Sequence, residues 1–470
     1  MPIENGKYLI ATGGIQAPTI RYHKGKFYII TTNTSREDPT APIRDNFIIS
    51  TSDIWSGQWS DPVHFDFYGI DTSFFIDDDE RCFIQGSWMM DREEQPKSTI
   101  YQVELDLETG KALSDTRLIW EGHFQYDTEG PHIYKRGEWY YLLAAEGGTF
   151  EHHKLSMARS RNVWGPYESY EHNPILTAEG TKEYIQGVGH GELFQDGDGD
   201  WWIVALGFRS HNGVWPLGRE TFLSKVDWPE GGWPKIEQPR GSFESKKLPS
   251  PKNLPGTDKV SDIVYLRGRN DDNYQLLQGP DQDVARLRPS QITLDDVYGL
   301  PTFLGRRQPN ISATGQVALD IRQPSAHGRP VLAGLTLHLD PLRYAYLAFD
   351  FTASQLRFKA INVAQDFTRD HTFELNLRKD LVHLKVEASA ERYAFFYSLQ
   401  STGAERLDKK GERAWKAAGI VSTAELSDRH FTGPLFGIFA QSTAAGCSDF
   451  VTFRGFQVQE IDSSCNPETV

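Results

Sequence analysis

The chain has few cysteines and no long apolar run. It contains 3 cysteines among 470 residues, Cys82, Cys447 and Cys465, which are too few and too scattered for a disulfide framework or a metal-binding knuckle. Cys82 lies in an apolar strand pattern, which predicts that its side chain is buried as a small hydrophobic group. No run of about 18 or more apolar residues occurs, so we expect no membrane span and no membrane partner.

Basic residues are outnumbered by acidic ones, 49 Lys and Arg to 64 Asp and Glu. The formal net charge is −15 at pH 7, and Lys and Arg form no stripe, so we expect no nucleic-acid partner, because a polyanion would be repelled. Residues 1–5 show neither the basic nor the apolar segment of a signal peptide. The compartment stays open: the cytoplasm if this N terminus is authentic, secretion if it is truncated.

Aromatic residues and turn formers are abundant. Phe, Trp and Tyr make up 12% of the chain, which also has 41 Gly and 25 Pro. So many tight turns favour an all-β fold. Planar aromatic faces stack on sugar rings but also fill the cores of β-sheets, so composition leaves both uses open.

Four segments of the first half share one pattern, an apolar strand, a polar turn and an aromatic-rich strand. Each predicts a β-hairpin. The turn centres Gly25, Glu80, Gly137 and Gly199 are 55, 57 and 62 residues apart. A recurring period of this size in an all-β chain indicates propeller blades. The alternative is a meander of unrelated hairpins, against which the regular period argues.

The second half has a different pattern. Residues 205–260 are rich in Pro and Gly, and residues 246–255 are typical of a linker. From about residue 262 onward, short alternating strands continue without the hairpin period, which predicts a β-sandwich. We therefore expect a propeller domain over residues 1–250 and a sandwich domain over residues 260–470.

Motifs beside the hairpins resemble glycoside hydrolase family 43, in collinear order. They are residues 13–22, 69–75, 129–135, 145–149, 189–191 and 217–221, while residues 303–308 and 431–433 resemble the β-xylosidase C-terminal, concanavalin A-like domain of that family. The resemblance implies a five-bladed propeller followed by a jelly-roll sandwich. It also implies a hydrolase that cleaves xylan-derived or arabinose-substituted oligosaccharides with inversion, as an exo-β-xylosidase, an α-L-arabinofuranosidase or both. The oligomeric state stays open.

The resemblance also implies roles for three residues. Glu129 would be the general acid, and Asp71 the carboxylate that raises the pKa of this acid and orients it. His190 would lie at the pocket floor, in contact with substrate or a central ion. No cofactor is expected beyond a structural calcium. The three aspartates at residues 77–79 fall at a hairpin tip and are expected to be solvated.

Four further residues resemble substrate-binding positions of the family. Arg219 would bind sugar through its fixed fork of N–H donors. Trp88 and Thr149 would line the pocket, and Phe431 of the second domain would close it.

The general base of the family is missing from its expected place. That base is an Asp in a motif like Asn-Pro-Asp-Pro-Ser-Ile, upstream of residues 13–14, but only twelve residues precede this point and their sole acid is Glu4. Ala17, in Ala-Pro-Thr-Ile, superficially resembles a replaced base, but its surroundings fit the second blade better, and Gln16 stands where the family usually has a pocket tryptophan.

Four recognisable blades out of five predict an exposed edge on an incomplete ring. Three explanations stay open for the missing base. A first blade is missing from an otherwise active enzyme, the protein binds sugar without cleaving it, or another carboxyl replaces the base. In each of the first two cases we expect this chain to be impaired as a hydrolase.

Overall fold

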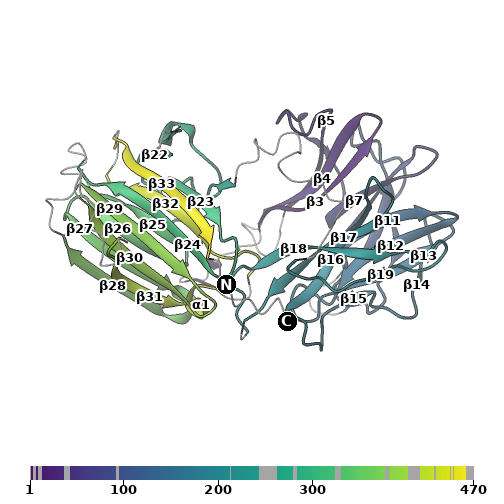
Figure 1. The fold of residues 1–470 in the computed structure, drawn as a ribbon. Coiled ribbons are helices and arrows are strands. Elements are labelled where there is room, and N and C mark those ends of the chain that lie inside the picture. Colours follow the sequence, from purple (N-terminus) through teal and green to yellow (C-terminus); the bar gives the residue numbers. More distant parts are fainter. Residues whose placement is uncertain are drawn as a thin grey trace. The chain divides into compact units, whose positions relative to one another are not determined.

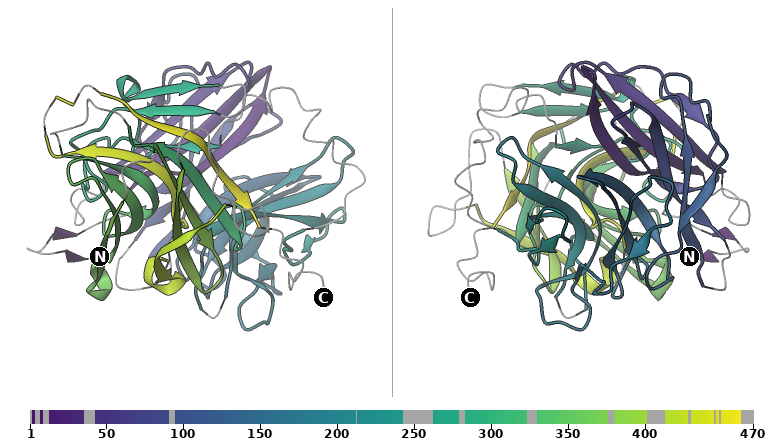
Figure 2. Two further views of the ribbon diagram at one scale, coloured as in Figure 1. Left: turned by 60° about the vertical axis from the view of Figure 1, so that its left-hand side comes forward. Right: turned by 90° about the vertical axis from the view of Figure 1, so that its right-hand side faces the viewer.

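The computed structural model contains two compact units. It describes residues 2–3, 7–8, 13–35, 43–90, 95–211, 213–242, 262–278, 283–322, 330–375, 380–400, 413–427, 430–444, 446–447 and 449–461. The first unit comprises residues 1–209 and 219–260, and the second comprises residues 210–218 and 261–470 (Figures 1 and 2). The predicted linker, residues 246–255, lies outside the described residues.

The first unit consists of four antiparallel sheets that follow one another along the chain. The first two sheets are formed by β3 (Gly14–His23), β4 (Lys26–Ser35), β5 (Ile43–Thr51) and β6 (Val63–Phe65), and by β7 (Ile70–Ile76), β8 (Cys82–Met89), β9 (Ser98–Glu104) and β10 (Arg117–Trp120). A small ribbon, β1 (Pro2–Ile3) with β2 (Lys7–Tyr8), precedes them.

The third and fourth sheets repeat this arrangement. They are formed by β11 (Glu129–Arg136), β12 (Trp139–Glu146), β13 (Lys154–Ser160), β14 (Glu168–Ser169) and β15 (Leu176–Thr177), and by β16 (Ile185–Gln195), β17 (Trp201–Arg209), β18 (Arg219–Asp227) and β19 (Lys235–Ile236). All four predicted hairpins are present, and their turns fall at the predicted centres. The four-bladed propeller arrangement expected from the hairpin period is therefore confirmed.

Each blade packs against the next one through apolar side chains. Ile30 and Ile48 of the first blade are buried with Phe74 and Ile84 of the second, and similar clusters join the second blade to the third and the third to the fourth. Cys82 lies in the first of these clusters, where burial raises the pKa of its thiol to about 12. As predicted, it acts as a small hydrophobic group.

The first blade carries exposed apolar side chains. Ile15, Ile20, Tyr22 and Ile43 are 67%, 47%, 64% and 67% exposed, although each lies on a strand of a well-formed sheet. Exposed apolar side chains also occur in other blades, such as Tyr68 at 57% and Leu113 at 56%, so the exposed edge expected for an incomplete ring stays a prediction.

The expectation for residues 77–79 is wrong at Asp77. Its side chain is buried and accepts hydrogen bonds from Lys135 Nζ and the Tyr140 hydroxyl, both at 2.6 Å, which tie the second blade to the third. Burial alone would raise the pKa of Asp77, but these bonds outweigh burial and hold it below its usual value. Asp78 and Asp79 are exposed, as predicted.

The second unit is a sandwich of two seven-stranded sheets (Figure 1). One sheet comprises β20 (Ile263–Val264), β23 (Phe303–Arg307), β32 (Leu435–Ser442), β25 (Val331–Asp340), β26 (Arg343–Asp350), β27 (Gln355–Asn362) and β28 (Phe367–Glu374). The other comprises β21 (Tyr274–Leu277), β22 (Val284–Leu287), β33 (Val451–Glu460), β24 (Ala313–Asp320), β29 (Leu381–Ala388), β30 (Arg392–Gln400) and β31 (Lys416–Ser422).

Alternating apolar residues of both sheets form the core of the sandwich. Leu335 and Leu347 of one sheet and Leu384 and Phe395 of the other are 0% exposed and belong to a single cluster. Period-2 alternation predicts this packing, because every second side chain of a strand points to the same face. The predicted β-sandwich is confirmed. Its short helical segments are α1 (Thr423–Leu426), η4 (Asp271–Asn273) and η6 (Val363–Gln365).

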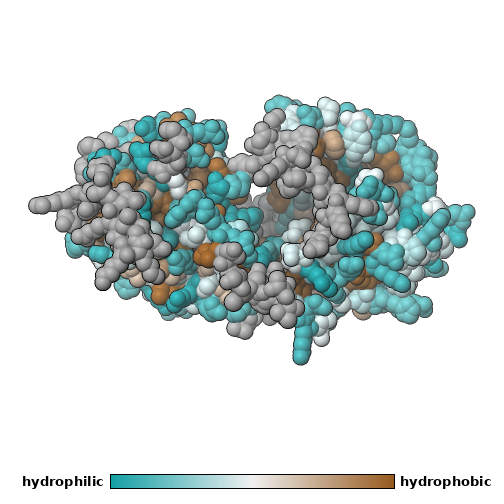
Figure 3. Space-filling view, in the orientation of Figure 1, coloured by the Kyte–Doolittle hydropathy of each residue, from teal (hydrophilic) through white to brown (hydrophobic). Residues whose placement is uncertain are grey.

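Polar residues predominate on the face of the molecule shown in Figure 3, with scattered apolar patches. Within the described part of the chain, no helix is long and apolar enough to cross a membrane.

Candidate active site

The first strands of the four blades share one irregularity. β3 packs against β7, β7 against β11, and β11 against β16, and in each of these strands the pairing register to the following strand shifts once or twice. A residue with positive φ lies at each shift: Ala17 at 41°, Asp71 at 54°, Gly130 at 56° and His190 at 43°. A β-bulge redirects the side chains next to it, so the fold has one such device per blade.

The bulges bring three titratable side chains together from three blades. One ligand-type atom each of Asp71, Glu129 and His190 lies within 4.8 Å of the others. Asp71 is 8% exposed, and Glu129 and His190 are half-buried. Left-handed backbone is costly for Asp71 and His190, by about 1–3 kcal/mol each, and persists where the surrounding structure enforces it.

The environment of Glu129 favours its protonated form. The pKa of Glu129 is raised to about 8, first by burial and then by the negative charge of Asp71, with a smaller contribution from Asp127, while the positive charge of Arg219 opposes these effects. At neutral pH this carboxyl therefore holds a proton beside an acidic neighbour, which is the state a general acid needs.

The imidazole of His190 is held neutral. Burial lowers the pKa of His190, against an opposing effect of Asp71, and the charge of Arg219 lowers it further. A neutral imidazole can donate one hydrogen bond and accept another. Two further buried histidines, His132 and His153, also have lowered pKa values through burial and through the charges around them.

Gly130 leaves the space that the His190 ring occupies. A Cβ built on Gly130 would lie 2.6 Å from His190 Nε2 and 2.8 Å from Cδ2, closer than any tolerated contact. Glycine is therefore required at position 130, because only glycine allows the acid strand and the histidine strand to approach this closely.

We expect Gly130→Ala to displace His190 and to destabilise the protein. The matched control is Gly137→Ala, at a similar φ of 59° but with nothing within 4 Å of the added Cβ. Both substitutions put alanine in left-handed backbone, at about 1–2 kcal/mol, but only Gly130→Ala adds an overpacking cost of about 1–3 kcal/mol. Thermal unfolding of the two variants measures this difference, and equal destabilisation would contradict the contact.

Arg219 is positioned by the residue that follows it. Arg219 opens β18 opposite Phe208, and the next residue, Glu220, forms a bidentate pair with Arg209 at 2.9 Å for both bonds. Because successive side chains of a strand point to opposite faces, anchoring Glu220 directs Arg219 the other way. Burial lowers the pKa of Arg219, and the charges of Glu129 and Asp71 raise it again, so all three groups lie in one electrostatic environment.

Sequence reasoning assigned no role to Glu146, although the residue stands inside one of the motifs. Glu146 is fully buried at the end of β12, and its Oε1 accepts the backbone N–H groups of Phe124 at 2.9 Å and Gln125 at 3.0 Å. These bonds shape the loop that leads into Glu129. A charged residue that ends an otherwise apolar strand was the available signal, because a buried carboxylate needs partners.

The other three predicted pocket residues are Trp88, Thr149 and Phe431. Trp88 stacks on Tyr101 at 4.7 Å and meets Phe67 edge-on within the second blade. Thr149 is half-buried in the loop after β12, and Phe431 is half-buried in the second unit. Their contact with substrate stays a prediction.

The cluster suits a calcium ion poorly. Calcium takes six to eight oxygen ligands, whereas Asp71, Glu129 and His190 offer two carboxyls and a nitrogen. Arg219 adds positive charge, and Glu129 has a pKa of about 8. We therefore assign no step of the chemistry to such an ion.

The bulge in β3, the first strand of the first blade, carries no carboxyl. Ala17 occupies the left-handed position that Asp71 and His190 hold in their blades. Gln16 comes just before it, as Glu129 comes just before Gly130, and its Oε1 accepts a hydrogen bond from Thr34 Oγ1 at 3.1 Å. Within the described residues, the cluster of ligand-type groups contains only two carboxyls.

These features define a glycoside hydrolase of the propeller type, and comparison with known proteins identifies its family. Residues 3–234 match the model of glycosyl hydrolases family 43, and residues 265–459 match that of the beta xylosidase C-terminal concanavalin A-like domain. The chain therefore belongs to glycosyl hydrolases family 43, and by this membership it is an O-glycosyl hydrolase.

Individual relatives span nearly the whole chain. It is 30% identical to a xylosidase/arabinosidase of Butyrivibrio fibrisolvens, over 95% of this chain and 86% of that protein. It is 28% identical to a non-reducing end alpha-L-arabinofuranosidase of Bacteroides ovatus, over 96% and 83%. The solved structure of a xylan beta-1,4-xylosidase from Bacillus halodurans superposes with a TM-score of 0.79 at 25% identity, covering 96% of this chain and 87% of that one.

Proposed function

We propose that this protein acts on xylan-derived or arabinose-substituted oligosaccharides, with Glu129 as the general acid of an inverting hydrolysis. The observation that carries the proposal is the meeting of Asp71, Glu129 and His190 in an environment that raises the pKa of Glu129 to about 8. The Butyrivibrio relative, a xylosidase/arabinosidase, and the Bacteroides relative, an arabinofuranosidase, support the substrate class.

Each residue contributes one element of the chemistry. Glu129 transfers its proton to the glycosidic oxygen as the bond to the anomeric carbon breaks, and the leaving sugar departs as an alcohol. Asp71 keeps Glu129 protonated until that step by its negative charge. Arg219 donates hydrogen bonds to substrate hydroxyls. A water molecule attacks the opposite face of the anomeric carbon and gives its proton to a general base, which must lie roughly 6.5–9.5 Å from the acid.

We propose that hydrolysis by this chain is impaired because the bulge of the first blade carries no carboxyl that could act as this base. The supporting observation is Ala17, which occupies the bulge position of the first blade without a carboxyl. The same observation favours a second candidate function, a protein that binds sugar at this site without cleaving it. The two differ in one measurable respect: a binder shows no turnover with or without a supplied base.

The proton affinity of Glu129 can be tested without turnover. We expect Asp71→Asn to lower the pKa of Glu129 below about 8, because it removes a neighbouring negative charge, and Arg219→Ala to raise it, because it removes a positive one. A ¹³C NMR titration of Glu-labelled protein measures both shifts, and Glu129→Gln assigns the signal. Shifts in the same direction for both variants would contradict the proposed electrostatics.

A further inference from the structure

The first sheet of the sandwich carries a second, smaller cluster on its outer face. Along β26, Leu347 and Phe349 point into the main core, whereas Tyr344 and Tyr346 pack with Leu294 and Phe439 in a separate cluster. Period-2 alternation places the two sets on opposite faces of the sheet. The outer face is thus a built surface with its own buried aromatic residues.

A cavity of about 240 Å³ lies on this face, entirely within the second unit. Its lining comes from the loop before β23, the start of β25, the strands β26 and β27, and the end of β32. The residues used below are Asp295, Leu332, Asp350, Arg357, Lys359 and Gln441. The cavity is smaller than the roughly 300–1,000 Å³ of drug-sized ligand pockets, so it suits one unit of a chain-like ligand.

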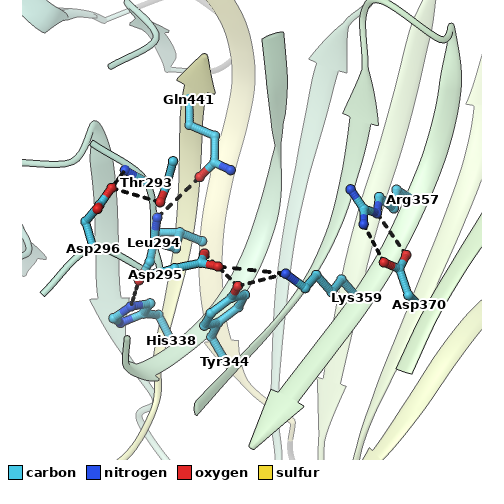
Figure 4. A network of polar contacts seen from close by, with 10 residues as sticks. All are labelled: Thr293, Leu294, Asp295, Asp296, His338, Tyr344, Arg357, Lys359, Asp370 and Gln441. Atoms are coloured by element: carbon cyan, nitrogen blue, oxygen red, sulfur yellow. Dashed lines mark hydrogen bonds and ion pairs between the residues drawn. The ribbon is translucent and has the colours of Figure 1, made fainter. Parts of the chain in front are cut away.

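The cationic groups of the cavity are already matched by anionic ones (Figure 4). Arg357 Nε donates to Asp370 Oδ1 at 2.8 Å, and a second bond joins the same two side chains. Lys359 Nζ lies 3.8 Å from Asp295 Oδ2 and 3.3 Å from the Tyr344 hydroxyl, which itself donates to Asp295 Oδ1 at 2.7 Å. With Asp350 as an additional carboxylate, the cavity has no excess of positive charge that would favour an anion.

Polar atoms remain for a ligand on both sides of the cavity. Gln441 Oε1 accepts the backbone N–H of Leu294 at 3.3 Å, which leaves its amide N–H groups as donors. Asp350 Oδ1 caps the turn after β26 by accepting the N–H groups of Thr352 and Ala353, which leaves Oδ2 as an acceptor. In the described part of the chain, the amide nitrogen of Gln441, Asp350 Oδ2 and the hydroxyl of Tyr346 have no hydrogen-bond partner.

The combination matches one ligand chemistry. Donors beside acceptors satisfy hydroxyl groups, which do both, and half-buried Leu332 offers an apolar patch for C–H groups. We propose that this cavity is a second glycan-binding site, which takes a sugar unit of a neutral oligosaccharide or polysaccharide. It is distinct from the propeller site and does not depend on hydrolysis there.

The site is largely preorganised. Its side chains stand on neighbouring strands in fixed register, with Leu332 paired to both Asp350 and Gln441 and with Lys359 paired to Tyr346. Polar groups held on rigid strands lose little freedom on binding, which favours weak but specific capture of a glycan chain.

The test measures xylohexaose binding to the full chain by calorimetry and retention of the chain on insoluble arabinoxylan. All variants carry Arg219→Ala, which removes the propeller-site arginine. We expect Gln441→Ala combined with Asp350→Asn to weaken xylohexaose binding about tenfold or more, because the first removes an N–H donor and the second replaces an acceptor oxygen by a donor. Thr372→Ala, an exposed position beside Arg357 on the same sheet, should leave binding unchanged.

Three results would overturn the proposal. The first is equal xylohexaose affinity for the cavity variant and the Thr372→Ala control. The second is no detectable binding of xylohexaose or arabinoxylan once Arg219→Ala is in place. The third is displacement of xylohexaose by inorganic phosphate at lower concentration than by xylose, which would make this an anion site. Circular dichroism spectra matching the parent chain show that the variants are folded.

Discussion

Joining a base-bearing blade to the N terminus should raise hydrolysis of nitrophenyl β-xyloside and nitrophenyl α-L-arabinofuranoside by about 10²–10⁴-fold, the usual contribution of general acid–base assistance. The added segment is a blade with the Asn-Pro-Asp-Pro-Ser-Ile-like motif. The effect is expected because Ala17 brings no carboxyl to the site and the first blade exposes Ile20, Tyr22 and other apolar side chains.

The same extended chain with its motif aspartate changed to asparagine is the matched control. It covers the exposed face of the first blade equally well but cannot accept a proton from water. We expect it to gain stability without gaining activity. A control that is as active as the aspartate form would show that the blade acts only by completing the fold, and that the base lies elsewhere.

In the extended chain, Glu129→Gln should lower kcat by about 10²–10⁴-fold on substrates whose leaving group needs a proton. The loss should be far smaller on dinitrophenyl glycosides, because their leaving group departs as a stable anion. Steady-state kinetics on both substrate types measures this split. The rate of the unsubstituted enzyme should also fall as pH rises through about 8, where Glu129 loses its proton.

Glu138→Gln is the matched control for this substitution. Glu138 lies on the same hairpin, but its side chain is 82% exposed and pairs with Arg161 at the surface, so its loss should leave kcat unchanged on both substrate types. An equal loss of kcat on nitrophenyl and dinitrophenyl substrates in Glu129→Gln would show that Glu129 supports the fold of the pocket and is not the proton donor.

Much of the fold could be predicted from local sequence signals. The hairpin turns at Gly25, Gly137 and Gly199 are strong signals because glycine tolerates positive φ, and the turn at Glu80 follows a run of turn-forming aspartates. All four are hairpin turns in the structure. The alternating strands of the second half predicted the sandwich for a similar reason, since period-2 patterning fixes which side chains face the core. The linker at residues 246–255 remains a prediction.

The candidate site was predicted in part. Family motifs singled out Asp71, Glu129, His190 and Arg219, and the structure brings Asp71, Glu129 and His190 together. Their convergence depends on bulges in strands from different blades, and no local pattern shows where a strand will bend. The roles of these residues remain to be tested by the variants above.

Two buried acids, Asp77 and Glu146, show why the remaining structural roles could not be predicted from the sequence. Asp77 stands in a run of three turn aspartates, and its burial depends on Lys135 and Tyr140 from the next blade. Glu146 depends on the backbone of a loop some twenty residues away in sequence, whose Phe124 and Gln125 N–H groups it accepts at 2.9 and 3.0 Å. Partners of this kind are fixed by tertiary packing, so the sequence around each acid does not reveal them.

The most direct test of the account is the hydrolysis of nitrophenyl β-xyloside and nitrophenyl α-L-arabinofuranoside by the present chain, with and without formate as a supplied base. Because Glu129 is protonated below about pH 8 and Ala17 brings no carboxyl to the bulge of the first blade, the account predicts turnover close to that of Glu129→Gln without formate. It predicts a clear rise with formate that Glu129→Gln abolishes. Rapid turnover without formate that is lost in Glu129→Gln would contradict the account, because the chain would then contain its own base.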